Sequence, residues 1–340
     1  MTVPDMDCPA PVGPVIGLDL GGTKISAGLV SADGDVRHEA SVATPALAGP
    51  AAIVAAMVAL VRPIAAAAEA EGSPALGLGV GAAGVIDPTT GIVTAATDHL
   101  PGWAGTPVAD RLATATGLPV RVVNDVHAHA LGEAHRGAGA GRATVLLVAA
   151  GTGLGGAIVV DGRVLTGSRG IAGHLGHVPS PEAAGLPCSC GRTGHLEAVA
   201  SGAGLLERYR ATMPVGVEEG GSVRASAVSG ADVARLADQG DPRAAACLDR
   251  SAVALGRAIG GWINTLDPDV VIVTGGLAQA GPRWWTRLCD AVDTGTIPAA
   301  TGCPVVPAAL GARAALIGAA SLLTSDHADH ADHSTVRTRA

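Results

Sequence analysis

The sequence contains one pattern of strands and glycine turns twice. Residues 15–42 read as an apolar strand, a glycine turn, a strand, an Asp-Gly turn and a strand, and residues 144–166 repeat this order. Each copy is followed by further strand and helix patterns, as in ALGLGVGAAG and VRVVND after the first and DVVIVTG after the second. Such alternation is typical of α/β folds. We therefore predict two similar α/β lobes facing each other across a cleft, which is a natural site for a nucleotide.

The length and composition fit two domains and exclude several classes of protein. The chain has 340 residues, 48% of them hydrophobic, with no Phe and one Tyr, so small aliphatic side chains must form the core around 49 glycines. The net charge of −8, with no run of Lys and Arg, argues against nucleic-acid binding. We see no apolar run of transmembrane length and no signal-peptide pattern at the start. We expect a cytoplasmic protein with neither nucleic-acid nor membrane partners.

The pattern also predicts boundaries. We expect an N-terminal lobe over 15–123, a C-terminal lobe over 124–310 with an insertion at 174–197, and a last helix within 311–323. The Ala-rich helix at 51–71 should be interrupted or kinked at Pro63. Residues 1–14 and 325–340 should be disordered, and the histidines of the second tail should be solvated rather than bound to a metal.

The two glycine turns favour phosphate binding but match no standard nucleotide motif. GTGLGG at 151–156 has the dinucleotide spacing, yet the strand AIVVDG follows where that fold needs a helix. The first turn has Walker-loop spacing between Gly17 and Gly22, but Thr23 stands where lysine is required. What remains is a hairpin whose glycines let backbone N–H groups approach phosphate. One such hairpin alone would be an ordinary turn, but a pair in repeated lobes favours phosphate.

Three polar residues at strand ends each allow two interpretations. Asp19 lies in an apolar strand, where a buried carboxylate needs either the turn backbone or a cation such as Mg²⁺ held through water. Asn124 and Asp125 end the strand VRVVND and precede a helix. They fit an N-cap, but a carboxylate there could also act as a general base on a substrate hydroxyl.

Residues 171–201 concentrate metal-ligand chemistry. The spacing His177–x10–Cys188–x–Cys190–x4–His195 offers two thiolates and two imidazoles, which suit a closed tetrahedral zinc site. The other cysteines are scattered, so in a reducing compartment this pair reads as metal ligands rather than a disulfide. His174 and Glu197 flank the group and could point into the cleft as hydrogen-bonding groups.

Together these motifs resemble the ROK family (repressors, open reading frames and sugar kinases) over about residues 15–323. The resemblance is carried by LDLGGTK at 18–24, VVNDVHAHALGE at 122–133, GTGLGG at 151–156, GHLGH at 173–177, CSCGRTGHLE at 188–197 and IVTGGLAQAG at 272–281. It implies an actin-like ATPase fold, with two ribonuclease-H-like lobes around an ATP cleft, in which the final helix returns to the N-terminal lobe. It also implies ATP, Mg²⁺ and a structural Zn²⁺ as cofactors, a sugar as substrate, and a homodimer.

The resemblance implies a role for each site residue. Asp125 would be the catalytic base on the sugar 6-hydroxyl. Sugar would be bound by Asn124, Gly84, His174, His177 and Glu197, and zinc by His177, Cys188, Cys190 and His195. ATP and its Mg²⁺ would be bound by Asp19, Gly21, Gly22, Thr23, Lys24, Gly151, Thr152, Gly153, Gly275 and Gly276.

Two departures from the family pattern bear on the substrate. His195 stands where a third cysteine is usual, and His174 stands where glucokinases of the family have glutamate. The second change resembles bacterial N-acetylmannosamine kinases. An imidazole in place of the carboxylate also removes a strong acceptor for a sugar hydroxyl, which could favour an N-acyl sugar. We therefore expect an N-acetylmannosamine kinase of amino-sugar catabolism, with glucokinase or N-acetylglucosamine kinase as alternatives. A sugar-responsive regulator without a DNA-binding domain and a non-catalytic sugar-binding module are the other hypotheses.

Overall fold

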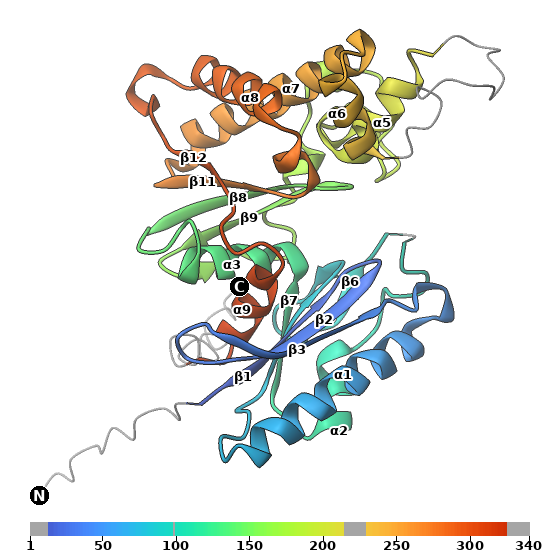
Figure 1. Cartoon of the computed structure of the whole chain (residues 1–340), viewed down its shortest axis with the longest axis vertical. Helices are drawn as coiled ribbons and strands as arrows, with labels where there is room; N and C mark the ends of the chain where they lie inside the picture. The colour runs from blue at the N-terminus through green and yellow to red at the C-terminus, as the bar shows by residue number, and fades with distance from the viewer. Residues whose placement is uncertain (1–12, 98, 214–228, 325–340) are drawn as a thin grey trace, which may run out of the picture. The chain divides into compact units, whose positions relative to one another are not determined.

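The computed structural model describes residues 13–97, 99–213 and 229–324, which form two compact units (Figure 1). Unit 1 contains the described residues up to Arg136, residues 168–170 and those from Ala312 onward, and unit 2 contains 137–167 and 171–311. The boundary follows Arg136, not residue 123 as predicted, because helix α3 (Asp125–Arg136) packs against α9 (Arg313–Ser321). Disorder was predicted for 1–14 and 325–340; residues 1–12 and 325–340 lie outside the described residues, whereas Pro14 is described and its carbonyl accepts the N–H of Leu76 at 2.9 Å.

Unit 1 is built on a five-stranded sheet with the order β3-β2-β1-β4-β7. Its strands are β1 (Val15–Leu20), β2 (Lys24–Val30), β3 (Val36–Ala43), β4 (Leu78–Ala82) and β7 (Val120–Asn124). Strand β1 pairs antiparallel with β2 and parallel with β4, and β4 pairs parallel with β7. Because helices cover both faces, β1 and β4 are apolar and almost wholly buried, as expected for central strands.

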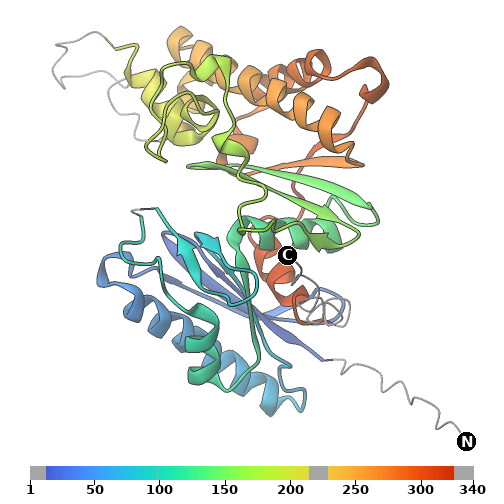
Figure 2. The same ribbon diagram turned by 180° about the vertical axis from the view of Figure 1, so that it is seen from behind.

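The helices of unit 1 lie in two layers. Helices α1 (Pro50–Ala70) and α2 (Val108–Thr116) lie against one face, and α3 and α9 against the other, as both views show (Figures 1 and 2). Helix α1 continues through Pro63 as one element. By length and composition it could also cross a membrane, so the expectation of no such apolar run was wrong. Core helices pass the same test, and Met57, Val61 and Ile64 of α1 lie in the core of unit 1.

Unit 2 repeats the topology of unit 1. Its sheet has the order β10-β9-β8-β11-β12, with β8 antiparallel to β9 and parallel to β11. The strands are β8 (Thr144–Ala150), β9 (Leu154–Val160), β10 (Arg163–Val164), β11 (Val270–Thr274) and β12 (Val305–Pro307). The helices are α4 (Glu197–Ala200), α5 (Gly202–Arg210), α6 (Gly230–Asp238), α7 (Pro242–Leu266) and α8 (Pro282–Gly295). The predicted duplicated ribonuclease-H-like fold is confirmed.

Glycines allow α9 to lie directly on the sheet of unit 1. A Cβ on Gly17 of β1 would overlap the carbonyl of Leu316, and one on Gly79 of β4 would overlap that of Ala319. The same applies to Gly132 of α3 and the carbonyl of Ala314. The glycine-rich strand and helix patterns therefore serve close backbone packing as well as turns.

Candidate functional site

The first glycine turn joins β1 to β2 and is held firmly at its base. The N–H of Gly21 donates to the carbonyl of Lys24 at 3.0 Å, and the hydroxyl of Thr44 donates to the carbonyl of Gly21 at 2.8 Å. Gly22, Thr23 and Lys24 are exposed in unit 1. The tip of the turn can therefore contact an anion while its base stays fixed, as phosphate binding by a backbone turn requires.

Asp19 carries a buried oxygen that lacks a partner. Its Oδ1 atom has no hydrogen bond among the described residues, which removes the alternative that this oxygen bonds the turn backbone. Burial, followed by the nearby Asp125 carboxyl, raises the pKa of Asp19 to about 7, although Lys24 opposes the rise. An isolated buried carboxylate oxygen is costly unless a cation approaches it, so the site fits Mg²⁺ chemistry.

Asp125 lies next to Asp19 because the parallel strands β1, β4 and β7 are in register. Gly81 of β4 pairs with Asp19 in β1, and a Cβ built on Gly81 would lie 3.8 Å from Asp19 Oδ1 and 3.5 Å from Asp125 Cα. Because residue 81 is glycine, it places no side chain of its own between the two carboxylates. The sequence alone did not place these two residues together.

Asn124 orients Asp125 and also caps α3. Its Oδ1 accepts the N–H groups of Val126 at 2.9 Å and His127 at 3.3 Å, so the N-cap interpretation is correct. Its Nδ2 donates to Asp125 Oδ1 at 2.8 Å and to the carbonyl of Gly84 at 2.9 Å. The cap and the general-base interpretations are therefore compatible, since the cap holds the carboxylate in place.

The Asp125 carboxylate is anchored through one oxygen. Its Oδ1 accepts from Asn124 and from the N–H of Val126 at 2.9 Å, and Oδ2 has no partner among the described residues. Burial raises the pKa of Asp125, and these hydrogen bonds oppose the rise only partly. A carboxylate fixed in this way, with one oxygen available, can accept a proton from a hydroxyl group.

Trp103, which the sequence analysis missed, holds the loop that carries Gly84. Its side chain is fully buried, and Nε1 donates to the carbonyl of Ala83 at 3.0 Å. Gly84 has a φ of 108°, and a Cβ there would lie 2.7 Å from the carbonyl oxygen of Ala95. Only glycine suits this position, whose carbonyl accepts from Asn124.

The second glycine turn, in unit 2, is tied to the start of α5. Gly151 donates to the carbonyl of Gly153 at 3.0 Å, and its own carbonyl accepts the N–H of Gly202 at 2.8 Å. The carbonyl of Thr152 accepts the N–H of Ala203 at 3.1 Å. Thr152 and Gly153 are exposed, and strand β9 follows directly, which confirms that this is not the strand-to-helix turn of a dinucleotide fold.

Gly275 and Gly276 follow β11 at the edge of the sheet where the second glycine turn lies. Strands β8 and β11 are parallel, so their carboxyl ends meet at that edge. Gly275 has a φ of 93°, and a Cβ there would lie 2.5 Å from the carbonyl of Ala150. Gly276 is exposed, so backbone from two segments of unit 2 is accessible together.

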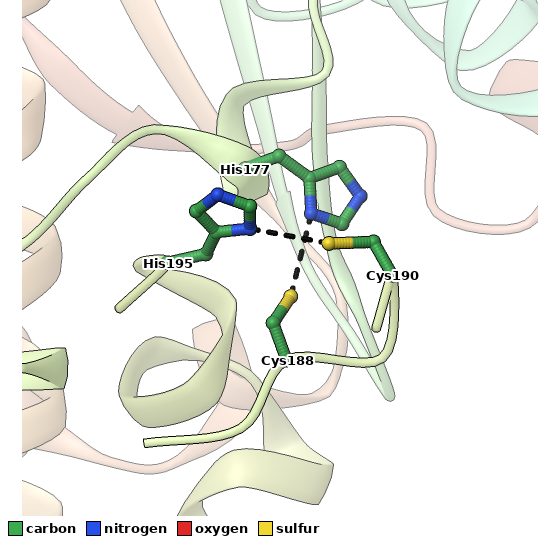
Figure 3. A group of neighbouring side chains, drawn as sticks. All are labelled: His177, Cys188, Cys190 and His195. Carbon is green, nitrogen blue, oxygen red and sulfur yellow. Dashed lines mark hydrogen bonds between the residues drawn. The ribbon is translucent and has the colours of Figure 1, made fainter. Parts of the chain in front are cut away.

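The four predicted zinc ligands converge in unit 2 (Figure 3). The ligand atoms of His177, Cys188, Cys190 and His195 all lie within 4.8 Å of one another. Cys188 Sγ is 3.5 Å from His177 Nδ1, and Cys190 Sγ is 3.2 Å from His195 Nδ1. Tetrahedral zinc with ordinary bond lengths places sulfur and nitrogen about 3.6 Å apart, so this donor set fits the metal.

A tight turn brings these ligands together. We call residues 177–195 the ligand segment. Within it Pro179 bridges His195, while Cys188 donates its N–H to the carbonyl of Arg192 at 2.8 Å. Gly191 and Gly194 have φ values of 82° and 83°, which the turn requires.

His174 and Glu197 flank the ligand segment in different environments. The His174 ring lies 6.3 Å from that of His177, and burial, followed by the charge of His177, lowers the pKa of His174. Glu197 begins α4. Its Oε2 accepts the N–H of Leu154 at 2.9 Å, and its Oε1 accepts from the hydroxyl of Ser189. The structure thus places Glu197 between the second glycine turn and the ligand segment, which the sequence analysis did not foresee.

Comparison with known proteins gives one consistent result. The ROK family pattern matches residues 15–326. The chain is 35% identical to a glucokinase of Thermotoga maritima over 91% of this chain and 96% of that protein. It is 34% identical to an N-acetylmannosamine kinase of Escherichia fergusonii over 78% of this chain and 84% of that protein. It also matches the structure of a Streptomyces griseus ROK glucokinase in complex with glucose and AMPPNP, with a TM-score of 0.74, 33% identity, and coverage of 91% of this chain and 99% of that one.

Proposed function

This chain belongs to the ROK family and is an ATP-dependent sugar kinase, and we propose that it phosphorylates the 6-hydroxyl of N-acetylmannosamine. The observation that carries the proposed reaction is the Asp19–Asp125 pair in unit 1. Asp125 would take the proton of the sugar hydroxyl through Oδ2, because Asn124 and the backbone hold Oδ1. Asp19 would hold Mg²⁺ through water, which neutralises charge on the phosphates.

The exposed glycine turns would bind the phosphates of ATP. In unit 1 this group comprises Gly21, Gly22, Thr23 and Lys24, and in unit 2 it comprises Gly151, Thr152 and Gly153. Gly275 and Gly276 would lie along the adenosine. Support comes from the hydrogen bonds that fix the base of each turn, since phosphoryl transfer depends mainly on positioning.

The ligand segment would hold zinc and present the sugar-binding groups of unit 2. A metal bound by His177, Cys188, Cys190 and His195 would fix the ring of His177, with His174 beside it. Glu197 would bind sugar hydroxyls with the lone pairs that its two intramolecular bonds leave free. An imidazole at residue 174 favours an N-acyl sugar over an additional bare hydroxyl, and this carries the assignment of N-acetylmannosamine.

Glucose is the second candidate substrate. Relatives named glucokinase and N-acetylmannosamine kinase are similar to this chain to almost the same degree, 35% and 34%. Under the same proposal the enzyme acts in the cytoplasm as a homodimer, without a nucleic-acid or membrane partner.

The test is ADP release by the purified protein with N-acetylmannosamine, N-acetylglucosamine and glucose. We expect turnover that depends on ATP and Mg²⁺, with the highest kcat/KM for N-acetylmannosamine. A higher kcat/KM for glucose would replace the substrate assignment, and no turnover with any sugar would contradict the kinase reaction. Asp125→Asn should lower kcat at least about 100-fold, the usual scale of general-base catalysis, with little change in sugar affinity. Asp33→Asn, at an exposed turn of the same unit, is the matched control.

A further inference from the structure

Glu197 connects two segments of unit 2 that are distant in sequence. Its Oε2 accepts the N–H of Leu154, the residue that follows the second glycine turn, at 2.9 Å. Its Oε1 accepts from the hydroxyl of Ser189, and Cys188 Sγ lies 3.8 Å from the same oxygen. Ser189 stands between two of the proposed metal ligands, so one carboxylate bridges the ligand segment and the glycine turn.

The glycine turn lies directly against this carboxylate. A Cβ built on Gly153 would lie 3.0 Å from Glu197 Oε2, a tight contact that glycine avoids beside the bond to Leu154. The other side of the turn is held by the N–H groups of Gly202 and Ala203 at the start of α5. Two supports therefore fix the turn, and one of them passes through Glu197 and Ser189.

We propose that Ser189 is a positioning residue that couples the metal centre to the nucleotide turn by orienting Glu197. This rests on the proposed function, in which Gly151, Thr152 and Gly153 bind ATP phosphates. With metal bound, the backbone on both sides of Ser189 is fixed, and its hydroxyl holds Oε1 so that Oε2 faces the Leu154 amide. Without the metal or the hydroxyl, Glu197 can rotate away and the turn loses one support.

The expected effect on nucleotide binding is moderate. Bringing the turn back into its binding shape should cost on the order of one net hydrogen bond, which corresponds to about a fivefold change in affinity. We therefore expect Ser189→Ala to weaken AMPPNP binding about fivefold and to leave bound zinc unchanged, since both thiols and both imidazoles remain. Ser189→Thr keeps the hydroxyl and should bind as the parent does, because residue 189 is exposed.

The experiment compares the parent, Ser189→Ala and Ser189→Thr for zinc content, AMPPNP affinity by calorimetry, and hydrogen exchange of peptides containing Leu154. Ser180→Ala is the matched control, because it removes another serine–glutamate bond of the ligand segment, to Glu182, that does not reach the glycine turn. We expect faster exchange at Leu154 in Ser189→Ala only. Removal of zinc from the parent should produce the same change, and removal from Ser189→Ala should add little.

The outcomes separate this coupling from the proposed function. If Ser189→Ala keeps the parent's exchange at Leu154 and its AMPPNP affinity, the coupling is refuted, whatever the enzyme's substrate. If Ser180→Ala and Ser189→Ala weaken binding equally, the effect is a general loosening of the segment and the coupling is also refuted. If the parent binds no AMPPNP and turns over no sugar, the proposed function fails, while altered exchange at Leu154 still supports the structural link.

Discussion

Replacing Asp19 with asparagine should stabilise unit 1 relative to the parent by an amount that grows with pH. Burial raises the pKa of Asp19 from its ordinary value of 3.8 to about 7. Below pH 3.8 both folded and unfolded chains hold the proton, so the group has no effect on stability. Between these two values the folded state alone holds it, and the parent loses about 1.4 kcal/mol of stability per pH unit. Above about pH 7 the loss is complete.

The neutral amide removes this dependence. From pH 5 to the raised pKa near 7 is two units, so the stability difference between variant and parent should increase by about 3 kcal/mol between pH 5 and pH 8. The comparison across pH is preferable to a single value, because the burial cost of the amide itself is the same at both pH values and cancels. The raised pKa of Asp125 is present in both proteins and largely cancels as well.

The assay is urea unfolding at pH 5 and pH 8, followed by pulse hydrogen exchange of peptides from β1 and β4, so that unit 1 is measured separately from unit 2. Mg²⁺ should restore stability at pH 8 in the parent and not in the variant, since the cation binds the ionised carboxylate. Asp33→Asn, at an exposed turn, should show no such change and serves as the control. An equal stability difference at both pH values would refute the burial argument for Asp19.

Three further predictions follow from single contacts. Gly79→Ala should destabilise the protein by about 3 kcal/mol because the new methyl overlaps the carbonyl of Ala319. The control Gly261→Ala, in a helix with open space around it, should raise Tm. Equal Tm changes in the two variants would contradict the close packing of α9. His195→Ala should lose zinc by elemental analysis, and full retention would exclude it as a ligand. Because burial raises the pKa of Asp125, kcat/KM should fall on acidification at a pH above the ordinary carboxyl range, and a profile flat to pH 4 would argue against this base.

Much of the fold could be predicted because its central strands carry local signals. The strands around each glycine turn are apolar runs ended by turn residues, and all the predicted ones are present. The hairpin of β5 (Val85–Ile86) and β6 (Val93–Ala95), helix α2 and edge strand β12 were missed. Each is short, and its conformation depends on the neighbour it pairs with or packs against, so sequence pattern alone says little. The misplaced lobe boundary has the same origin, because α3 joins unit 1 by packing on a helix almost two hundred residues later.

In the candidate site, too, the features with a local sequence signal were predictable and those that depend on contacts with other segments were not. The convergence of the four proposed metal ligands was predictable because they lie within one short segment, where spacing already limits the geometry. The supports of the site were not predictable, since Thr44, Trp103 and Ser189 each act through a single hydrogen bond to a residue of another element or turn. A serine or threonine in a loop has no sequence signature for such a role.

The pairing of Asp19 with Asp125 shows why strand register matters more here than either residue type. Taken alone, each carboxylate has an ordinary structural explanation. Register places Asp19 beside Gly81 in β4, and Gly81 pairs with Val123 in β7, two residues before Asp125. Since glycine has no side chain, the Asp125 carboxyl comes close enough to disfavour ionisation of Asp19. A slip of one residue between β1 and β4 would turn Asp19 to the other face of the sheet, so the chemistry of unit 1 depends on the same pairing that builds its core.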